Sequence, residues 1–422
     1  MSEGIPEGWE IKTIKDCIEQ FKNGYAFSSS GYVASGIPII SIVNISLEGK
    51  FKFDEAREKK WSIDDSKKLN GFKVYDGDLI IAMTDVTPGM DMIGRGAIVK
   101  RNIISLLNQR VGLIKTKIDL DKTYLAYFLN GNRWRKTAKR SASLGAQANL
   151  GTADILSSSI LLPPLPEQKK IASILTSVDE VIESTQKQID KLQDLKKATM
   201  NELLTKGIGH TEFKDTELGR IPKSWKLGLV GEYSSLVTNG FVGSAVQHYR
   251  SEGIPYLVSK NIRDNYIDER GLTYISKEFH EKTTKSQLKI GDLLTVQSGH
   301  VGSSAVVSQK FNGANCHALI LTRFDHNLIK SDFVAYYFNS QIGRLRLSNY
   351  FVGSTIVHLN TSDLKRFKFP IPNLSEQVEV VTIIKSIERQ ISFWNNKLTH
   401  TKYLKKSLMQ DLLTGKVRVS VN

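Results

Sequence analysis

One short segment of this chain, RWRKTAKR at residues 133–140, concentrates positive charge around a tryptophan. It holds five basic residues and no acidic residue. Guanidinium and ammonium groups mixed with aromatic and amide groups suit contacts with phosphates and base edges. A solvated helix face is the ordinary alternative for any single run of this kind.

The charge of the whole chain agrees with a polyanionic partner. Its 422 residues carry a formal net charge of +15, and its isoelectric point is about 9.5. The polyanionic partner of a strongly basic protein is most often nucleic acid. On charge alone, a generally basic enzyme is an open alternative. A second segment, which contains Arg344, Arg346 and Tyr350, lies at the equivalent place in the other half of the chain. This recurrence favours DNA contact in both halves.

Short polar loops at matching positions of the two halves are further candidates. The residues around them match between the halves, whereas the loops differ, so two copies of one scaffold would read two different short sequences. Drift of surface residues is the alternative for any one loop. The candidate DNA-binding residues are Lys22, Asn23, Tyr25, Asn44, Thr84, Arg95, Arg133, Arg135, Lys136, Arg140, Asn239, Phe241, Lys260, Asn261, Gln297, Ser298, His300, Arg344, Arg346 and Tyr350.

No catalytic constellation accompanies these residues, so we predict no catalytic residue and no metal or cofactor site. All eight histidines follow residue 209, which leaves the first half without a histidine base or ligand. The phosphate-binding pattern G-x-x-x-x-G-K-[S/T] is absent. Two E-x-K fragments, at 10–12 and 58–60, lack the Pro-Asp dipeptide that a nuclease site would place upstream. We expect partner proteins to supply any reaction.

The two cysteines, Cys17 and Cys316, are too few for a disulfide framework or a structural zinc site, which favours a reducing compartment. The N-terminal sequence MSEGIPEGWEIK has no apolar core of a signal peptide. No apolar run approaches the roughly 20 residues that cross a bilayer. The cytoplasm is the expected location.

A long internal repeat organises the chain. Glu167-Gln168 and Glu376-Gln377 lie 209 residues apart, and each pair precedes a segment in which apolar residues recur at regular intervals. Other motifs recur in the same order, such as Asn23-Gly24 and Asn239-Gly240 at an offset of 216. A period of this length indicates duplicated domains rather than a solenoid of short repeats.

Each half begins with a mixed α/β domain. Runs such as GIPIISIVNI and GIPYLV predict strands, whereas residues 124–129 and 333–338 predict short amphipathic helices. Four segments follow from this pattern: residues 1–160 as the first domain, 161–207 as a central helix, 208–368 as the second domain, and 369–422 as a C-terminal helix and tail.

Each half ends in a long helix with heptad spacing, which is typical of a coiled coil. A helix of about 38 residues would be roughly 55 Å long. We expect the apolar heptad positions of the two helices to pack against each other. In the alternative, the apolar side of each helix packs on its own domain as ordinary core. The predicted helix-pair interface consists of Ile171, Leu175, Val178, Ile182, Ile189, Leu192, Leu203, Val380, Ile384, Ile387, Ile391, Trp394, Leu398, Leu408 and Leu412.

Pro166 and Ser375 occupy equivalent positions at the predicted helix starts, where proline suits the first turn and serine suits the N-cap. Gly207 and Gly415 follow the last leucines as expected helix stops. Either relative direction of the two helices is open from the sequence. An antiparallel pair would place one domain at each end of a rod.

This layout resembles the specificity subunit of type I restriction-modification systems. The resemblance rests on LPPLPEQ and PNLSEQ before the two helices, on TELGRIPKSW at the opening of the second domain, and on LLTKG and LLTGK at the helix ends. It covers essentially the whole chain and implies an α+β fold. Two target recognition domains would be separated by two long antiparallel helices that form a coiled coil, with an internal pseudo-twofold repeat.

The resemblance also implies a function and partners. The two domains would read the halves of an asymmetric, interrupted site in double-stranded DNA, and the helix pair would space them. The helix pair would also dock two modification (methyltransferase) subunits, and two restriction subunits would complete the endonuclease. S-adenosylmethionine, ATP and magnesium are expected on those partners and not on this chain. A stand-alone sequence-specific DNA-binding protein and a coiled-coil adaptor without such partners are the alternatives.

Overall fold

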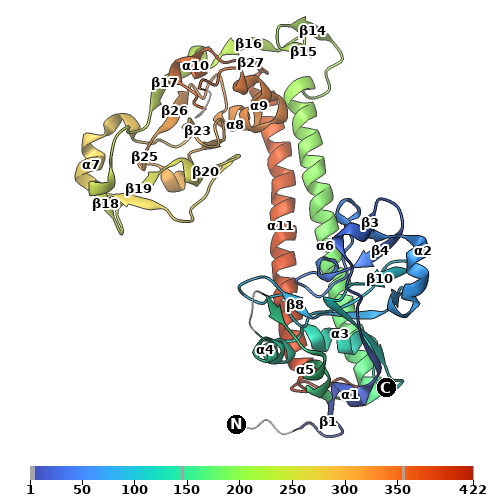
Figure 1. The fold of residues 1–422 in the computed structure, drawn as a ribbon. Coiled ribbons are helices and arrows are strands. Elements are labelled where there is room, and N and C mark those ends of the chain that lie inside the picture. Colours follow the sequence, from blue (N-terminus) through green and yellow to red (C-terminus); the bar gives the residue numbers. More distant parts are fainter. Residues whose placement is uncertain (1–4, 144–146, 354–356, 422) are drawn as a thin grey trace. The chain divides into compact units, whose positions relative to one another are not determined.

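The computed structural model describes residues 5–143, 147–353 and 357–421. The chain forms two compact units, Met1–Gln186 with Asn396–Asn422 as unit 1 and Lys187–Asn395 as unit 2. Each unit holds one α/β domain and one part of each of two long helices (Figure 1). We call the domains head 1, residues 10–162, and head 2, residues 226–371.

The same antiparallel four-stranded sheet forms the centre of each head, with the order β2-β11-β7-β9 in head 1 and β17-β26-β23-β24 in head 2. Strands β7 and β23 are buried along their whole length, which explains why β7 is entirely apolar and β23 is apolar except for Thr295. The strands are β2 Ile18–Asn23, β11 Val111–Thr116, β7 Leu79–Ala82, β9 Gly96–Ile98, β17 Ser234–Asn239, β26 Leu319–Phe324, β23 Leu293–Val296 and β24 Ser304–Val306.

A second sheet is also shared. Its order is β3-β5-β4-β10-β6 in head 1 and β18-β22-β19-β25 in head 2, and in both heads one pair, β4 with β10 or β19 with β25, is parallel. The strands are β3 Tyr32–Val33, β5 Lys60–Trp61, β4 Ile37–Ile40, β10 Ser105–Leu107, β6 Lys73–Val74, β18 Tyr249–Arg250, β22 Thr273–Ile275, β19 Ile254–Leu257 and β25 Asn315–Cys316.

Two-stranded ribbons close each head where the chain enters and leaves it, β1 with β13 and β16 with β27. The other strands are short. The bounds are β1 Glu10–Thr13, β13 Ser159–Leu162, β16 Lys226–Leu229, β27 Lys368–Ile371, β8 Thr84–Asp85, β12 Ala148–Asn149, β14 Phe213–Thr216, β15 Gly219–Pro222, β20 Ile262–Arg263 and β21 Tyr266–Ile267.

Four short helices of head 1, α2 to α5, recur in the same order in head 2 as α7 to α10, and α3 and α8 confirm the two amphipathic helices predicted from the sequence. Their bounds are α1 Ile14–Cys17, α2 Ile63–Ser66, α3 Lys122–Asn130, α4 Asn132–Ser141, α5 Thr152–Ser157, α7 Lys277–Lys282, α8 Ser331–Asn339, α9 Gln341–Ser348 and α10 Thr361–Arg366. Within the described ranges, every helix is too short or too polar to span a lipid bilayer.

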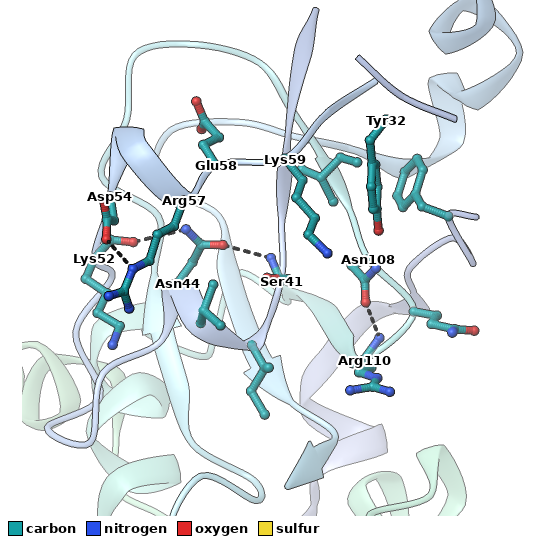
Figure 2. A pocket seen from close by; sticks show the side chains of 15 residues that line it. Tyr32, Ser41, Asn44, Lys52, Asp54, Arg57, Glu58, Lys59, Asn108 and Arg110 are labelled. Atoms are coloured by element: carbon teal, nitrogen blue, oxygen red, sulfur yellow. Dashed lines mark hydrogen bonds and ion pairs between the residues drawn. The ribbon is translucent and has the colours of Figure 1, made fainter. Parts of the chain in front are cut away.

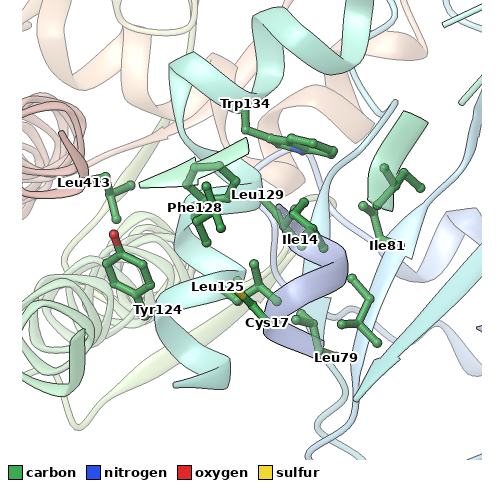
Figure 3. Packing of buried hydrophobic residues seen from close by; sticks show 14 of the residues in the cluster. Ile14, Cys17, Leu79, Ile81, Tyr124, Leu125, Phe128, Leu129, Trp134 and Leu413 are labelled. Atoms are coloured by element: carbon green, nitrogen blue, oxygen red, sulfur yellow. The ribbon is translucent and has the colours of Figure 1, made fainter. Parts of the chain in front are cut away.

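The core of head 1 packs α3 and α4 against the central sheet. Tyr124, Leu125 and Leu129 of α3 are fully buried, and Trp134 of α4 is 2% exposed. Figure 3 shows these side chains gathered with strand β7, and Leu413 of a long helix joins them. The core is therefore shared between a head and the end of that helix.

The long helices are α6, Leu165–Lys206, with 42 residues, and α11, Leu374–Leu413, with 40 residues. Pro166 lies in the first turn of α6, as predicted. Gly207 and Gly415 have φ angles of 68° and 71°, so they end the helices in the left-handed conformation that glycine adopts readily, as predicted.

The N-cap prediction for Ser375 is wrong. Helix α11 begins one residue earlier, at Leu374, and Asn373 caps it. The Asn373 Oδ1 accepts hydrogen bonds from the Glu376 N–H at 2.9 Å and from the Ser375 hydroxyl. The serine therefore supports the cap without forming it.

Within each unit the two helices run antiparallel. In unit 1, Asp179 of α6 pairs with Lys405 of α11 at 2.8 Å, while Glu167, earlier in α6, meets Arg418, beyond the end of α11. In unit 2, Lys196 of α6 pairs with Glu388 of α11 at 2.7 Å. The antiparallel direction that the resemblance implied is confirmed.

A buried carboxylate at each helix start ties the head to both long helices. Glu167 is 3% exposed; it accepts a hydrogen bond from the Trp9 indole at 3.0 Å and two from the Arg418 guanidinium at 2.8 and 2.9 Å. Burial alone would raise the pKa of Glu167, but the Arg418 and Trp9 hydrogen bonds lower it. The carboxylate is thus held ionised.

Glu376 repeats this junction in unit 2 with one changed partner. It accepts from the Trp225 indole at 3.0 Å and from the Ile208 N–H at 3.1 Å, and it contacts His210 Nε2 at 2.8 Å. His210 therefore takes the place that Arg418 has in unit 1. Both basic residues follow the end of a long helix, so each junction joins the start of one helix to the end of the other.

The neighbouring glutamines bind backbone groups of the heads. Gln168 accepts from the Asp121 N–H at 2.8 Å and donates to the Asp119 and Pro163 carbonyls at 3.1 and 2.9 Å. Gln377 accepts from the Lys330 N–H at 2.8 Å and donates to two further carbonyls, those of Leu328 and Pro372. These contacts satisfy groups that would otherwise be buried without partners.

The residues of the predicted helix-pair interface are all buried or half-buried. At the outer turns they also contact the heads: Ile171, Leu175 and Leu412 belong to the core of head 1, and Val380 and Ile384 to that of head 2. The two packing arrangements considered from the sequence therefore coexist at the helix ends.

Replacing Gln377 with alanine should loosen the junction of unit 2. The Lys330 N–H would have no acceptor, and we expect local stability to fall by about 2 kcal/mol. Amide hydrogen exchange of the full-length chain would show faster exchange at Lys330. The control is Glu379→Ala, at an exposed position two residues further along α11, which should leave this amide protected. Equal protection of Lys330 in both variants would contradict the assignment.

Candidate nucleic-acid interface

Helix α4 carries an exposed basic face in head 1. Arg133, Lys136 and Arg140 are exposed and spaced by three and four residues, so they share one side of the helix. Trp134 and Ala138 occupy the opposite, buried side, and the Trp134 indole donates to the Gly94 carbonyl at 2.7 Å. The tryptophan therefore fixes which side of α4 faces outward.

This basic face borders a groove of about 510 Å³ within unit 1. The other side of the groove is formed by the end of α11, including Met409, Gln410 and Thr414. Three cations on one wall give the groove a positive character that suits a phosphate backbone.

Arg135, the fourth candidate on α4, points inward. It is 8% exposed, and its Nη2 donates to the Met90 and Asp91 carbonyls at 3.1 and 2.9 Å. Burial lowers its pKa to about 10, so it is still protonated at neutral pH. The structure gives Arg135 the role of holding the loop that follows Asp85.

That loop, residues 85–92, is an insertion, because the equivalent place in the second half of the chain has no counterpart to it. The Asp85 carboxylate accepts from the Thr87 N–H at 2.8 Å and the Ile93 N–H at 3.3 Å. Burial alone would raise the Asp85 pKa, but these backbone hydrogen bonds lower it. Candidate Arg95 supports the same loop by donating to a backbone carbonyl at 2.6 Å, and candidate Thr84 is buried in β8.

The other candidates of head 1 lie around its Asn-Gly loop and second sheet. Tyr25 is 37% exposed and packs edge-on against Phe72, over whose ring the Lys22 ammonium lies. Asn23 is exposed, and its side chain accepts a hydroxyl hydrogen bond at 3.0 Å. Asn44 is half-buried and caps a turn, since its Oδ1 accepts a backbone N–H at 2.8 Å.

In head 2 the polar groups of several candidates are used internally. Asn261 is fully buried, and its amide bonds two backbone groups of its own loop. Arg344 pairs with Asp264, and Arg346 donates to the Tyr337 hydroxyl and a backbone carbonyl. The Tyr350 hydroxyl lies 3.4 Å from a backbone carbonyl of α10. These side chains stabilise head 2, and the two arginines do not form a basic face like that of α4.

The remaining candidates of head 2 are more accessible. Asn239 and Lys260 are exposed, and Phe241 packs edge-on against an aromatic ring of α7 with centroids 4.9 Å apart. His300 is exposed and contacts a backbone carbonyl of β20 through Nε2 at 3.0 Å. Two more candidates, Gln297 and Ser298, are half-buried beside it.

A pocket of about 520 Å³ in head 1 has basic residues that were not predicted from the sequence. Lys52, Arg57, Lys59 and Arg110 line it together with aromatic rings, and Figure 2 shows their side chains. Lys59 lies over the Tyr32 ring at 4.6 Å, so cations and aromatic faces occur together here. Lys52, Arg57 and Lys59 lie within or beside a run of mixed charge at residues 54–60, whereas Arg110 is distant in the sequence, and neither feature distinguishes these residues as a basic site.

Among the described residues, no group of three or more His, Cys, Asp or Glu side chains is placed to hold a metal ion. Cys17 and Cys316 are both buried and free, and burial raises the pKa of each thiol.

Comparison with known proteins assigns both halves of the chain to one family. The family model described as "Type I restriction modification DNA specificity domain" matches residues 6–194 and 222–401. Each match contains one head and most of the long helix that follows it, in line with the repeat seen in the sequence and the fold.

Curated relatives match over nearly the full length. The putative type I restriction enzyme MjaX specificity subunit of Methanocaldococcus jannaschii is 28% identical over 98% of this chain and 95% of its own length. The type I restriction enzyme EcoBI specificity subunit of Escherichia coli is 24% identical over 98% of this chain and 87% of its own.

Solved structures share the fold at low sequence identity. A chain from a study of complex assembly in a type I restriction-modification system aligns with a TM-score of 0.58 and 16% identity, over 98% of this chain and all of that one. The type I restriction-modification S subunit of M. genitalium aligns with a TM-score of 0.56 and 13% identity, over 98% of each chain.

The exposed face of α4 should contribute to DNA binding in a salt-dependent way. Replacing Arg133, Lys136 and Arg140 together with glutamine should weaken binding to all sequences. The slope of log K against log salt should fall by about 0.9 for each phosphate that these side chains neutralise in the wild type, or at most roughly 2.7. Titrations of labelled duplex at several salt concentrations measure this slope.

The matched control is Thr137→Ala, an uncharged change at another exposed position of α4. It should leave the slope as in the wild type. A triple variant with the wild-type slope would remove this face from the interface.

Proposed function

The chain belongs to the type I restriction-modification DNA specificity family, and from this premise we propose that its two heads read the two halves of one interrupted, asymmetric DNA site. The observation that carries the proposal is the duplication: each family match contains a complete head with the same sheet order. The chain is a specificity subunit and is not an enzyme by itself. As a DNA-reading protein it would work in the cytoplasm.

The difference between the heads supports an asymmetric site. Head 1 presents an exposed basic face on α4 and the loop after Asp85, whereas the arginines of α9 in head 2 are paired internally. Two heads with one framework and unlike surfaces would bind DNA in the same manner and select different bases.

The duplication also supports two copies of one partner. In unit 1, Lys405, Lys406 and Met409 of α11 line a groove of about 640 Å³. In unit 2, the residues 209 positions earlier, Lys196, Lys197 and Met200 of α6, line a smaller groove of about 350 Å³. Two related grooves would give two modification subunits equivalent docking surfaces.

The proposed assembly contains this chain, two modification subunits and two restriction subunits on double-stranded DNA. S-adenosylmethionine for adenine methylation would bind the modification subunits, while ATP and magnesium would bind the restriction subunits. The specificity chain would contribute target selection and the distance between the half-sites.

A stand-alone DNA reader and a protein-only adaptor are the competing functions. The basic face of α4 argues against a protein-only adaptor, because three exposed cations on one face suit a phosphate backbone. Co-purification of the full-length chain with its co-expressed modification subunit separates the assembly from the stand-alone reader.

Lengthening both helices should lengthen the unread gap of the target. Inserting seven residues after Gln188 in α6 and seven after Asn395 in α11 keeps the heptad phase in each helix. It adds about 10 Å, or roughly three base-pair steps. Mapping of methylated adenines in cells that contain the modification subunit should show a longer gap between unchanged half-sites.

The control inserts seven residues after Ile118, which is 93% exposed in a loop of head 1, and the gap should stay as in the wild type. Altered half-sites, or an unchanged gap in the helix variant, would argue against the helices as the spacer.

A further inference from the structure

One turn is held in both heads by the same set of backbone hydrogen bonds. We call it the knot turn: residues 108–110, after β10, in head 1, and residues 317–318, after β25, in head 2. In head 1, the Tyr25 N–H donates to the Leu107 carbonyl at 2.7 Å and the Gln109 N–H donates to the Tyr25 carbonyl at 2.9 Å. In head 2, Phe241 makes the same two bonds with the Cys316 carbonyl and the Ala318 N–H, at 2.9 and 3.0 Å.

Glycine makes this close approach possible in both heads. A Cβ atom at Gly24 would lie 2.1 Å from the Asn108 carbonyl oxygen, and one at Gly240 would lie 2.7 Å from the Cys316 carbonyl oxygen. No side chain fits between the two backbone segments. The glycine of the recurring Asn-Gly motif is therefore the residue against which the knot turn packs.

The tips of the two turns differ in length and chemistry. The sequence is Asn108-Gln109-Arg110 in head 1 and His317-Ala318 in head 2, one residue shorter. Ala318 has a φ angle of 49°, which lets the shorter turn close. A shared framework thus carries different side chains at one equivalent place.

Arg110 is available at its tip. The residue is exposed, and its backbone N–H is bound by the Asn108 side chain at 3.1 Å, as Figure 2 shows, so the turn is fixed by a contact that leaves the guanidinium unused. Among the residues that the structure describes, no carboxylate pairs with this guanidinium. The lining of this pocket holds four basic side chains, including Lys59, and two carboxylates, Asp54 and Glu58, of which Asp54 pairs with Arg57, so Arg110 stands in a region of net positive charge.

His317 is oriented by a buried tyrosine. Its Nδ1 lies 3.0 Å from the hydroxyl of Tyr256, which is fully buried and has no other hydrogen-bond partner among the described residues. Burial raises the pKa of Tyr256 and lowers that of His317, so the phenol keeps its proton and the imidazole is neutral. The hydroxyl donates to Nδ1, and the ring proton is then on Nε2.

We infer that the knot turn is a base-reading element of each head, with Arg110 as the reading side chain of head 1 and His317 as that of head 2. The inference deepens the proposed function and rests on it. The exposed Arg110 guanidinium has the fork that binds O6 and N7 of guanine, the most frequent specific contact in the major groove. The neutral His317 offers one donor, Nε2–H, to one base acceptor.

Selection of bound duplexes from a random-sequence pool tests this with the purified full-length chain at fixed salt. The wild type should select two separated half-sites. Arg110→Gln and Arg110→Lys should both reduce the preference for guanine at one position of one half-site, by roughly 10- to 100-fold, because neither side chain has the guanidinium fork. Arg110→Lys keeps the charge, so its affinity for unrelated DNA should stay near that of the wild type.

The variants of head 2 should act on the other half-site alone. His317→Asn places the residue type of head 1 at this position and should change one base preference. Tyr256→Phe removes the hydroxyl that fixes the imidazole tautomer and should relax the same preference, which a purely structural role would not do. Arg133→Gln is the matched control on α4; it should weaken binding without changing either half-site.

The outcomes separate the inference from the function on which it rests. If the wild type selects two half-sites and the Arg110 and His317 variants select the same two, the knot turn does not read bases. The proposed function would not be affected by that result. A wild-type chain that selects no sequence at all would contradict the proposed function, and the knot turn with it.

Discussion

The buried carboxylates Glu167 and Glu376 are the constraint on which the structure depends. An ionised carboxylate removed from water is costly unless donors surround it, and here an indole and a group beyond the end of the antiparallel helix supply them. Each carboxylate therefore fixes three parts at once: the start of one long helix, the opening of a head and the end of the other helix. The adjacent Gln168 and Gln377 bind the backbone at the starts of α3 and α8, which adds these helices to the same junction.

This junction lets one framework carry two specificities. Because the contacts to the helices use buried groups, the outer surface of each head is free to change while the junction is kept. The heads differ in this way at the insertion after Asp85, at the basic face of α4 and at the tip of the knot turn. The unit 1 junction uses Arg418 where unit 2 uses His210, so even here the same geometry is reached with unlike basic residues.

The elements of the fold are predictable from the sequence because their signals are local or periodic. The apolar runs at β4 and β19, the heptads of α6 and α11, and the glycines that end both helices all appear where expected. Trp9 and Glu167 are visible as recurring residues, but their contact joins positions 158 residues apart, and no local rule predicts it. At the start of α11, Asn373 and Ser375 are both good caps by residue type, and only the backbone conformation decides between them.

The candidate site is less predictable. Arg133 and Arg135 are the same residue type in the same run; the burial of Trp134 sets the phase of α4 and turns Arg135 inward. Asn261 lies in a loop that matches one in the first half of the chain, yet its side chain accepts a hydrogen bond from a backbone N–H of its own turn. Arg110 and His317 carry no sequence signal of their own, since neither belongs to a charged run. Only a residue-by-residue comparison of the two halves would point to them, because the repeat changes its length at the knot turn.

The spacing of two heads by antiparallel helices is tested most directly by a chain with head 1 in both places, residues 6–162 replacing residues 222–371, expressed with the modification subunit. Antiparallel helices predict that two copies of one head read opposite strands, so mapped methyladenines should lie in an inverted repeat of a single half-site around the original gap. A direct repeat of that half-site, or the original asymmetric target, would contradict this arrangement.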